Sequence, residues 1–281
     1  MSKQVIVMRR KIRSGKVTEV SQFFLGEKKS RRPRVKGSSS AAKKDSNLSQ
    51  AVRRLGRTLN CNLSSEWLLL TLKYEGALPA TREDAERNVK LFIRRLARRG
   101  VKFSGVWITA DRDAMTKEPV RLHHHMLIRL TPQIRVKQVK RPDSDKRYLC
   151  AWLGSDTLED IWGHGQMNVR RIADVDDYSP LAVYFVEQAI GGDNVKKWHA
   201  SHGLEQPEII SEEILDKAEA LRAPGGADIK EMSEYDEEFG THYIRYVARP
   251  DRAVRNGYER ADKKAVLLGA KSRQRTERRY I

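Results

Sequence analysis

The chain has little cysteine and no long apolar run. Only two of its 281 residues are cysteine, Cys61 and Cys150, and their separation matches no metal-binding or redox motif. Such sparse cysteine use suits a reducing compartment. No apolar stretch approaches the roughly 18 residues of a membrane-spanning helix, and the first residues have too short an apolar core for a secretory signal. We therefore expect a cytoplasmic protein with no membrane partner.

Acidic residues are also fewer than basic residues. The chain has 37 Asp and Glu against 55 Lys and Arg, which gives a formal net charge of +18. An excess of this size makes a polyanion the default partner, with nucleic acid ahead of an acidic membrane surface. Hydrophobic residues make up 39% of the chain, enough for a core, and there is no internal repeat. Basic charge alone does not identify one function, because many unrelated nucleic-acid-binding proteins share it.

The charge pattern and the positions of Gly, Pro and Ser residues divide the chain into three parts. Residues 1–47 are rich in Lys and Arg and predict a basic, partly ordered N-terminal arm, with possible strands near 4–8 and 17–24. Residues 48–207 form the main domain. Residues 208–281 predict a C-terminal extension with a helix over 211–222, a strand over 243–247 and a basic tail.

The main domain alternates between strand and helix patterns and predicts an α+β fold, with a central antiparallel sheet flanked by helices. Thr81 begins a helix through a capping-box pattern, and Ser179-Pro180 begins another as N-cap and first helical residue. The segment 131–147 is charged and contains Pro, and we expect it to be irregular. The predicted strands are 66–74, 101–111, 121–128 and 166–172, and the predicted helices are 48–59, 81–100, 152–162 and 179–190.

Three adjacent histidines lie inside one of these strands, in Arg121-Leu-His-His-His-Met-Leu-Ile128. Successive side chains of a strand point to opposite faces, so His123 and His125 share one face and His124 points to the other. Two neutral imidazoles on one rigid face can hold one divalent metal ion. Asp111 ends the preceding strand and is the carboxylate best placed to be a third ligand. The alternative is that the histidines only line a polar surface.

The helix after Pro180 carries three polar residues on one side. Tyr184, Glu187 and Gln188 are spaced i, i+3 and i+4, while most of the other positions are apolar. This spacing lets one phenol face a polar site from a buried helix. On its own, a helical tyrosine is more often a core residue whose hydroxyl is satisfied.

The ordered set of these motifs resembles one family. Tyr74 closing a Leu-Thr-Leu strand, the histidine triplet, Trp162-Gly-His-Gly165, Leu181-Ala-Val-Tyr184 and Lys197-Trp-His-Ala-Ser-His-Gly-Leu204 occur in the order found in rolling-circle replication initiators of the HUH endonuclease class. The similarity is to the replication-associated proteins of single-stranded DNA phages and Gram-positive mobile elements. It covers roughly residues 48–207.

The resemblance implies a metal-assisted DNA-nicking enzyme with an HUH endonuclease palm. It makes His123 and His125 ligands of Mn²⁺ or Mg²⁺ and makes Tyr184 the nucleophile, which forms a 5′-phosphotyrosine and leaves a free 3′-hydroxyl as primer. Members often have Lys where this chain has Glu187, and the third metal ligand stays open among Asp111, Glu187 and Gln188.

The resemblance also implies partners: single-stranded or cruciform origin DNA and the helicase and polymerase of a bacterial host. We see no Walker-type phosphate loop, so a fused helicase is not expected. Two other functions stay open, a related HUH relaxase or transposase and a non-catalytic basic DNA-binding protein. The predicted DNA-contacting side chains are basic or aromatic: Arg94, Arg95, Arg98, Arg99, Lys196, Lys197 and Trp198.

Overall fold

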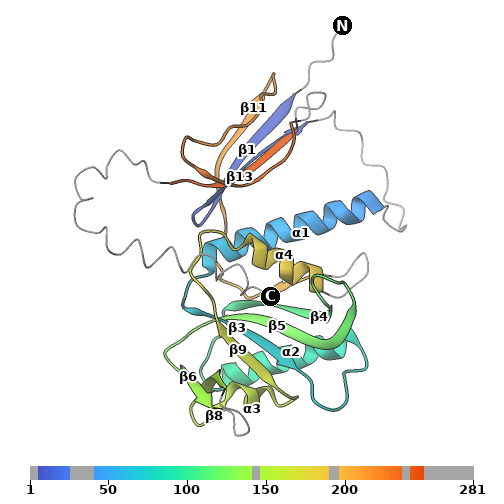
Figure 1. Ribbon diagram of the computed structural model, residues 1–281, viewed down its shortest axis with the longest axis vertical. Coiled ribbons are helices and arrows are strands. Elements are labelled where there is room, and N and C mark those ends of the chain that lie inside the picture. Colours follow the sequence, from blue (N-terminus) through green and yellow to red (C-terminus); the bar gives the residue numbers. More distant parts are fainter. Residues whose placement is uncertain (1–5, 26–40, 141–145, 190–195, 236–240, 250–281) are drawn as a thin grey trace, which may run out of the picture.

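The protein is an α+β structure with two antiparallel sheets, seen in a computed structural model that describes residues 6–25, 41–140, 146–189, 196–235 and 241–249. Figure 1 shows the arrangement as layers: a small sheet at the top, helices α1 and α4 below it, the larger sheet, and helices α2 and α3 beneath. The predicted central antiparallel sheet flanked by helices is confirmed.

The larger sheet is built around three apolar strands. Its order is β10-β4-β5-β3-β9-β7-β6, with β8 paired to β7, and every pair is antiparallel. The middle strands β3, β4 and β5 are apolar on both faces because helices cover both sides of the sheet. The strand bounds are β3 Trp67–Lys73, β4 Gly105–Arg112, β5 Pro119–Arg129, β6 Ile134–Lys140, β7 Arg147–Leu153, β8 Asp156–Thr157, β9 Met167–Arg171 and β10 His199–Ala200.

Each face of this sheet has its own core. One face packs Met126 and Ile128 of β5 against helix α2 (Arg82–Arg98) and helix α3 (Leu158–Trp162). The other face packs Leu127 against helix α1 (Ala41–Asn62) and helix α4 (Ser179–Gln188). The period-two alternation of β5 therefore decides which side chain meets which pair of helices. No helix within the described ranges is long and apolar enough to cross a membrane.

The small sheet combines strands from the N-terminal and C-terminal parts of the chain. Its order is β11-β1-β2-β13-β12, so the N-terminal pair β1 and β2 lies between strands from the part after residue 207. The predicted arm and extension are thus one structural unit in their described residues. The bounds are β1 Val7–Ser14, β2 Val17–Phe24, β11 Glu208–Leu215, β12 Asp228–Met232 and β13 His242–Val247.

The predicted helix over 211–222 is wrong, because this segment begins inside strand β11. Its Glu-rich sequence favours a helix locally. Pairing with the basic strand β1 overrides that preference: Glu212 lies opposite Arg10 and forms an ion pair with it, and Glu208 pairs with Arg13 at 2.6 Å. A single sequence window does not reveal such long-range partners. The strands predicted over 17–24 and 243–247 are confirmed.

Four predictions for the main domain and its boundary need correction. The segment 131–147, expected to be irregular, contains β6 and the start of β7, which pair as a hairpin. The helix predicted over 152–162 is only α3, because β7 runs to Leu153 and Thr157 caps the helix with a capping box. Helix α1 begins at Ala41, ahead of the predicted boundary at residue 48. Ser179 is not the N-cap of α4; Tyr178 occupies that position.

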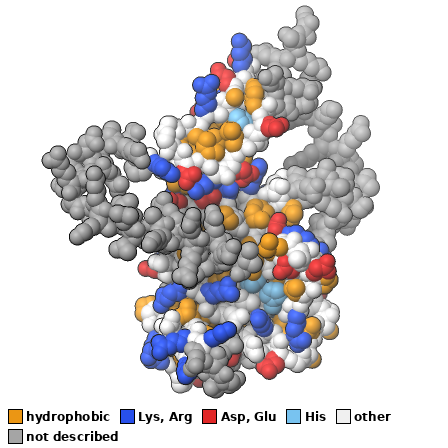
Figure 2. Space-filling view, viewed as in Figure 1, with side chains coloured by type: hydrophobic (Ala, Val, Ile, Leu, Met, Phe, Trp, Pro, Cys, Tyr) orange, Lys and Arg blue, Asp and Glu red, His pale blue; other side chains and the backbone are white. Residues whose placement is uncertain are grey.

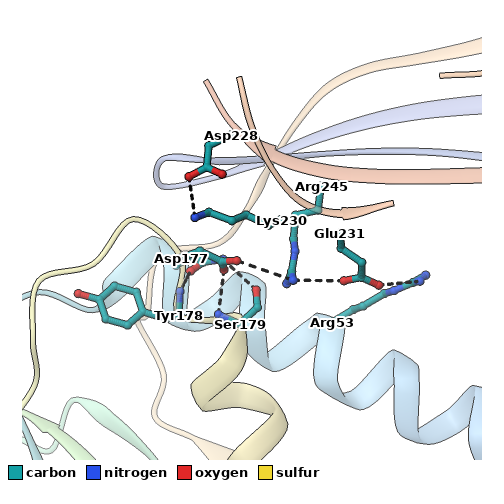
Figure 3. A network of polar contacts seen from close by, with 9 residues as sticks. Arg53, Asp177, Tyr178, Ser179, Asp228, Lys230, Glu231 and Arg245 are labelled. Carbon is teal, nitrogen blue, oxygen red and sulfur yellow. Dashed lines mark hydrogen bonds and ion pairs between the residues drawn. The ribbon is translucent and has the colours of Figure 1, made fainter. Parts of the chain in front are cut away.

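A polar network connects the small sheet to the start of α4 (Figure 3). Asp177 Oδ1 accepts from the Ser179 backbone N–H at 2.9 Å and from the Asn60 amide at 3.3 Å. Arg245 of β13 lies 3.7 Å from Asp177 Oδ2 and 3.2 Å from Glu231 Oε2. Because Asp177 is only 6% exposed, its carboxylate is a buried anchor for α4.

We expect Asp177→Ala to lower the free energy of unfolding by about 2–3 kcal/mol, because the substitution removes the cap of α4 and one partner of a mostly buried arginine. Urea unfolding measures this change. The matched control is Asp176→Ala, whose carboxylate forms only an exposed ion pair with Lys16 and should change stability by less than about 1 kcal/mol. Equal effects of the two substitutions would contradict the anchoring role.

Candidate functional site

Strand β5 places its histidines between two neighbouring strands. Thr71 of β3 and Ile108 of β4 lie on either side of His125, and Lys73 and Ala110 lie on either side of His123. Because Leu127 faces α1 and α4, His123 and His125 face the same side by alternation. The predicted shared face of His123 and His125 is present in the structure.

The two imidazoles converge through their Nε2 atoms. His123 Nε2 and His125 Nε2 are 3.1 Å apart. His123 Nδ1 lies 2.9 Å from the Arg121 carbonyl oxygen, which can only accept, so Nδ1 carries the proton and Nε2 presents a lone pair. His125 Nδ1 lies 3.2 Å from Thr71 Oγ1. Both rings are thus oriented by a partner on the side away from the pair, an arrangement common among metal-ligating histidines.

Helix α4 brings Tyr184 and Gln188 to the same place. Gln188 Oε1 lies 3.3 Å from His125 Nε2, while its amide group donates to the Tyr184 backbone carbonyl at 3.1 Å. The ring centroids of Tyr184 and His125 are 5.5 Å apart. An isolated bridge between Ala110 of β4 and Ala189 fixes the end of α4 against the sheet. The i, i+4 spacing of Tyr184 and Gln188 then puts both on the histidine side.

A cavity of about 530 Å³ opens over this group, and its lining contains three basic residues and two carboxylates, Glu75 and Asp113. Figure 2 shows histidine side chains at the surface of the larger part of the molecule, next to Lys and Arg side chains. The guanidinium of Arg121 donates hydrogen bonds to the carbonyl oxygens of Tyr74 and Gly76. The lining includes His123, Tyr184, Gln188, Thr71, Lys73, Arg112 and Arg121.

Burial keeps the histidine pair neutral. Burial, together with the charges of His123, Arg170 and Lys73, lowers the pKa of His125 from 6.5 to about 3. Burial also lowers the pKa of His123, against the raising effect of the Arg121 carbonyl. A neutral imidazole is the form that binds a metal. At neutral pH both rings are therefore uncharged.

Gln188 is the oxygen donor that fits beside the two histidines. Two atoms bound to one ion at about 2.1 Å, in neighbouring positions of a tetrahedral or octahedral shell, lie about 3.0–3.4 Å apart. The Nε2–Nε2 and Nε2–Oε1 distances of 3.1 and 3.3 Å match this spacing. Among the described residues no group of three His, Cys, Asp or Glu side chains is arranged to hold a metal. The side chains that could hold an ion here are therefore two imidazoles and one amide oxygen.

The other two candidate ligands point elsewhere. Glu187 Oε2 forms an ion pair of 2.8 Å with Lys117 Nζ, from the connection between β4 and β5. Asp111 follows Ala110 at an irregularity of the β4–β5 ladder, and its Oδ1 lies 3.4 Å from Arg112 Nε. Its charge still acts on His123, whose pKa it raises slightly. Neither carboxylate joins the two Nε2 atoms in a three-ligand group.

His124 lies in the opposite core, as the alternation predicts. It is fully buried, with Nε2 2.8 Å from Tyr74 Oη and Nδ1 3.0 Å from Thr109 Oγ1. Its ring makes edge contacts with Trp162 and Trp107. Burial lowers its pKa to about 3. This histidine holds β5 in place and does not face the cavity.

The four predicted DNA-contacting arginines lie on α2, which covers the sheet face opposite the histidine pair. Arg95 donates to the carbonyl oxygens of Ile161 and Trp162 at 2.9 Å each, and so caps α3. Arg99 forms an ion pair with Asp156 at 3.0 Å. Arg94 and Arg98 are exposed. The structure does not bring this arginine row to the site.

The segment Lys196-Lys197-Trp198 lies beyond the end of α4. Trp198 packs partly buried against the core under α1 and α4, and Lys197 Nζ donates to the Ala189 carbonyl at 3.4 Å. The Lys196 carbonyl accepts from Arg82. Trp198 therefore has a packing role, and Lys197 lies close to the C-terminal end of α4.

Two basic residues near the histidines were not predicted. Lys73 lies opposite His123 on β3, and Arg170 lies opposite Leu69 on β9, so both share the histidine face of the sheet. Both are exposed, and neither forms an ion pair with any described residue. The signal was available in the alternation of strands 66–74 and 166–172, but it needs the strand pairing to be known.

No protein-family model, curated protein or solved structure matches this chain.

We expect His124→Gln to make the free energy of unfolding fall less steeply as the pH drops below about 6.5. The unfolded chain protonates His124 near pH 6.5 and the folded protein only near pH 3, so stability falls as pH drops through this window, by up to about 1.4 kcal/mol per pH unit for this group. Glutamine keeps hydrogen-bonding capacity without titrating. Urea unfolding at several pH values, with a chelator present, measures how the free energy of unfolding depends on pH in the unmodified chain and in His124→Gln. Identical slopes would show that His124 is not held neutral by the fold.

Proposed function

We propose that this protein is a DNA strand-nicking and strand-transferring endonuclease of the HUH class, in which Tyr184 is the nucleophile. The observation that carries the proposal is the convergence of His123 Nε2, His125 Nε2, Gln188 Oε1 and the Tyr184 ring at one cavity. These groups come from a strand and a helix about sixty residues apart in sequence. In this proposal the larger sheet with its flanking helices is the HUH palm.

His123, His125 and Gln188 would hold one divalent ion, Mn²⁺ or Mg²⁺. When bound, such an ion offsets the negative charge that builds on a scissile phosphate. Gln188 contributes no charge, so the three protein ligands leave the full positive charge of the ion facing the phosphate. The neutral state of both imidazoles keeps the ligand set available at neutral pH.

Tyr184 Oη would attack the phosphorus of the scissile phosphodiester. A bond forms between Oη and phosphorus, the bond from phosphorus to the 3′ oxygen breaks, the phenolic proton leaves Oη, and the 3′ oxygen takes up a proton. The product is a 5′-phosphotyrosine and a free 3′-hydroxyl. A free phenol is mostly protonated at neutral pH, so attack depends on the phosphate being held beside the ring.

Lys73 and Arg170 would bind the strand next to the cut. Both project from the histidine face of the sheet, and both are exposed with no ion pair among the described residues. Phosphates that approach these two cations bring the strand across the Tyr184 side of the sheet. A rigid sheet positions such contacts with little loss of conformational entropy.

Within this class we propose a rolling-circle replication initiator in the cytoplasm of a bacterial host. The substrate would be single-stranded or cruciform origin DNA, and the free 3′-hydroxyl would serve the host polymerase. The 281 residues contain no Walker-type phosphate loop, so strand unwinding would come from a host helicase. The net charge of +18 suits a DNA partner.

Tyr184→Phe should abolish a covalent protein–DNA adduct while leaving DNA affinity within about twofold, because only the nucleophilic oxygen is lost. The assay incubates the protein with a pool of labelled single strands and Mn²⁺, followed by denaturing electrophoresis. The matched control is Tyr178→Phe, since Tyr178 is buried and its hydroxyl donates to the Ala173 carbonyl. An adduct that persists in Tyr184→Phe would refute the assigned nucleophile.

Gln188→Ala should raise the metal concentration for half-maximal adduct formation by at least about tenfold, because one ligand is removed. Gln188→Glu should lower that concentration, since a carboxylate binds a divalent cation more strongly than an amide. Glu187→Gln is the control on the same helix, and its carboxylate pairs with Lys117. If Glu187→Gln changed the metal requirement and Gln188→Ala did not, the third ligand would be Glu187.

A further inference from the structure

A second cavity, of about 510 Å³, lies between the small sheet and helix α1. Its walls come from strands β1, β2 and β13 on one side and from residues 50–57 of α1 on the other. The histidine cavity is instead lined by the larger sheet and α4. The two cavities therefore lie on different sides of the α1–α4 layer. A volume of this size is in the range that accommodates small ligands.

Four arginines line this second cavity, and no carboxylate does: Arg10, Arg53, Arg54 and Arg57. Arg57 is neutralised by the buried Glu19 at 2.7 Å, and Arg10 pairs with Glu212. Arg53 stacks over the Tyr243 ring at 4.0 Å and forms a long ion pair of 4.0 Å with Glu231. Arg54 is exposed and has no ion pair with any described residue. The cavity therefore carries an unneutralised positive charge.

The remaining lining suits a nucleotide. Phe23 is half-buried and offers an aromatic surface, and Ser21, Gln50, Ser233 and Thr241 offer hydroxyl and amide groups. Guanidinium groups bind phosphate through charge-assisted hydrogen bonds, and aromatic rings stack on bases of any sequence. Cationic and aromatic groups together in one concave wall are the combination that binds single-stranded nucleic acid.

We propose that this cavity is a second nucleotide-binding site, with a phosphate held by Arg54 and Arg53 and a base beside Phe23. The shared chemistry is a phosphate joined to a planar base, which a DNA strand or a free nucleotide can supply. The site is separate from the histidine pair, and its occupancy does not depend on nicking. A DNA strand bound in both cavities would pass around the layer of α1 and α4.

The test compares two substitutions with the same change in charge, Arg54→Glu in the cavity and Lys137→Glu on the exposed face of β6. Affinity for a labelled 12-nucleotide single strand is measured by fluorescence anisotropy in the presence of a chelator, over a series of salt concentrations. We expect Arg54→Glu to bind at least fivefold more weakly than Lys137→Glu. The slope of log affinity against log salt should shrink by about 0.7 more than in the control, the value for one phosphate contact on a single strand.

A second titration uses deoxyadenosine 5′-monophosphate. Binding of this mononucleotide to the unmodified chain, lost in Arg54→Glu, would support the site with a free nucleotide as a source. Loss of strand affinity alone would support it with DNA as the source. If Arg54→Glu matched Lys137→Glu with both probes, the proposal would be overturned. Gln50→Glu provides a second variant, because it adds a negative charge to the exposed wall of the same cavity and should weaken binding in the same assay.

Thermal unfolding of each variant shows whether the fold is intact. Adduct formation at saturating DNA reports the chemistry at Tyr184 separately from occupancy of the second cavity. A chain that fails to nick but shows the difference between Arg54→Glu and Lys137→Glu would refute the proposed function and retain this site. A chain that nicks DNA but shows no difference between Arg54→Glu and Lys137→Glu would refute only the second nucleotide-binding site.

Discussion

The two-residue repeat of strand β5 is the constraint on which the site depends. It sends His123 and His125 toward α4 and buries His124 between Tyr74 and Thr109 in the other core. A shift of register by one residue would exchange these environments, placing two imidazoles in the apolar core and one at the cavity. The hydrogen bonds of His124 therefore fix the register that makes the other two histidines meet.

Helix α4 is held at both ends, which sets the position of Tyr184. Its N-terminus is bound by Asp177, which also contacts Asn60 of α1 and Arg245 of the small sheet. Its C-terminus joins β4 through the bridge between Ala110 and Ala189. Gly56 eases the close approach of α1, because a Cβ atom there would lie 3.1 Å from Ser179 Oγ, a tight contact. The small sheet thus contributes to the placement of Tyr184 without contacting the cavity.

Sequence periodicity predicted the parts of this structure that depend on local order. The shared face of His123 and His125 follows from alternation alone, and the proximity of Tyr184 and Gln188 follows from helical spacing. The parts it missed depend on partners distant in the chain. Strand β11 forms because β1 supplies basic residues about two hundred positions away, and Lys73 reaches the site only because β3 pairs with β5. The sequence also left three candidates for a third metal ligand. The structure separates two of them, because Glu187 pairs with Lys117 while Gln188 Oε1 lies 3.3 Å from His125 Nε2.

The charge arrangement at the site is compatible with the proposed binding of a phosphate, even though Glu187 lies on its helix. Lys117 neutralises that carboxylate at 2.8 Å, so the helix contributes little net charge near Tyr184. The cations Lys73 and Arg170 are on adjacent strands of the sheet and act on His125 closely enough to lower its pKa. A phosphate bound there would be attracted to strand residues fixed by the ladder, and the nucleophile would approach from the helix. Binding charge and nucleophile therefore come from different elements, so substitutions on the sheet should alter affinity and those at Tyr184 should alter chemistry.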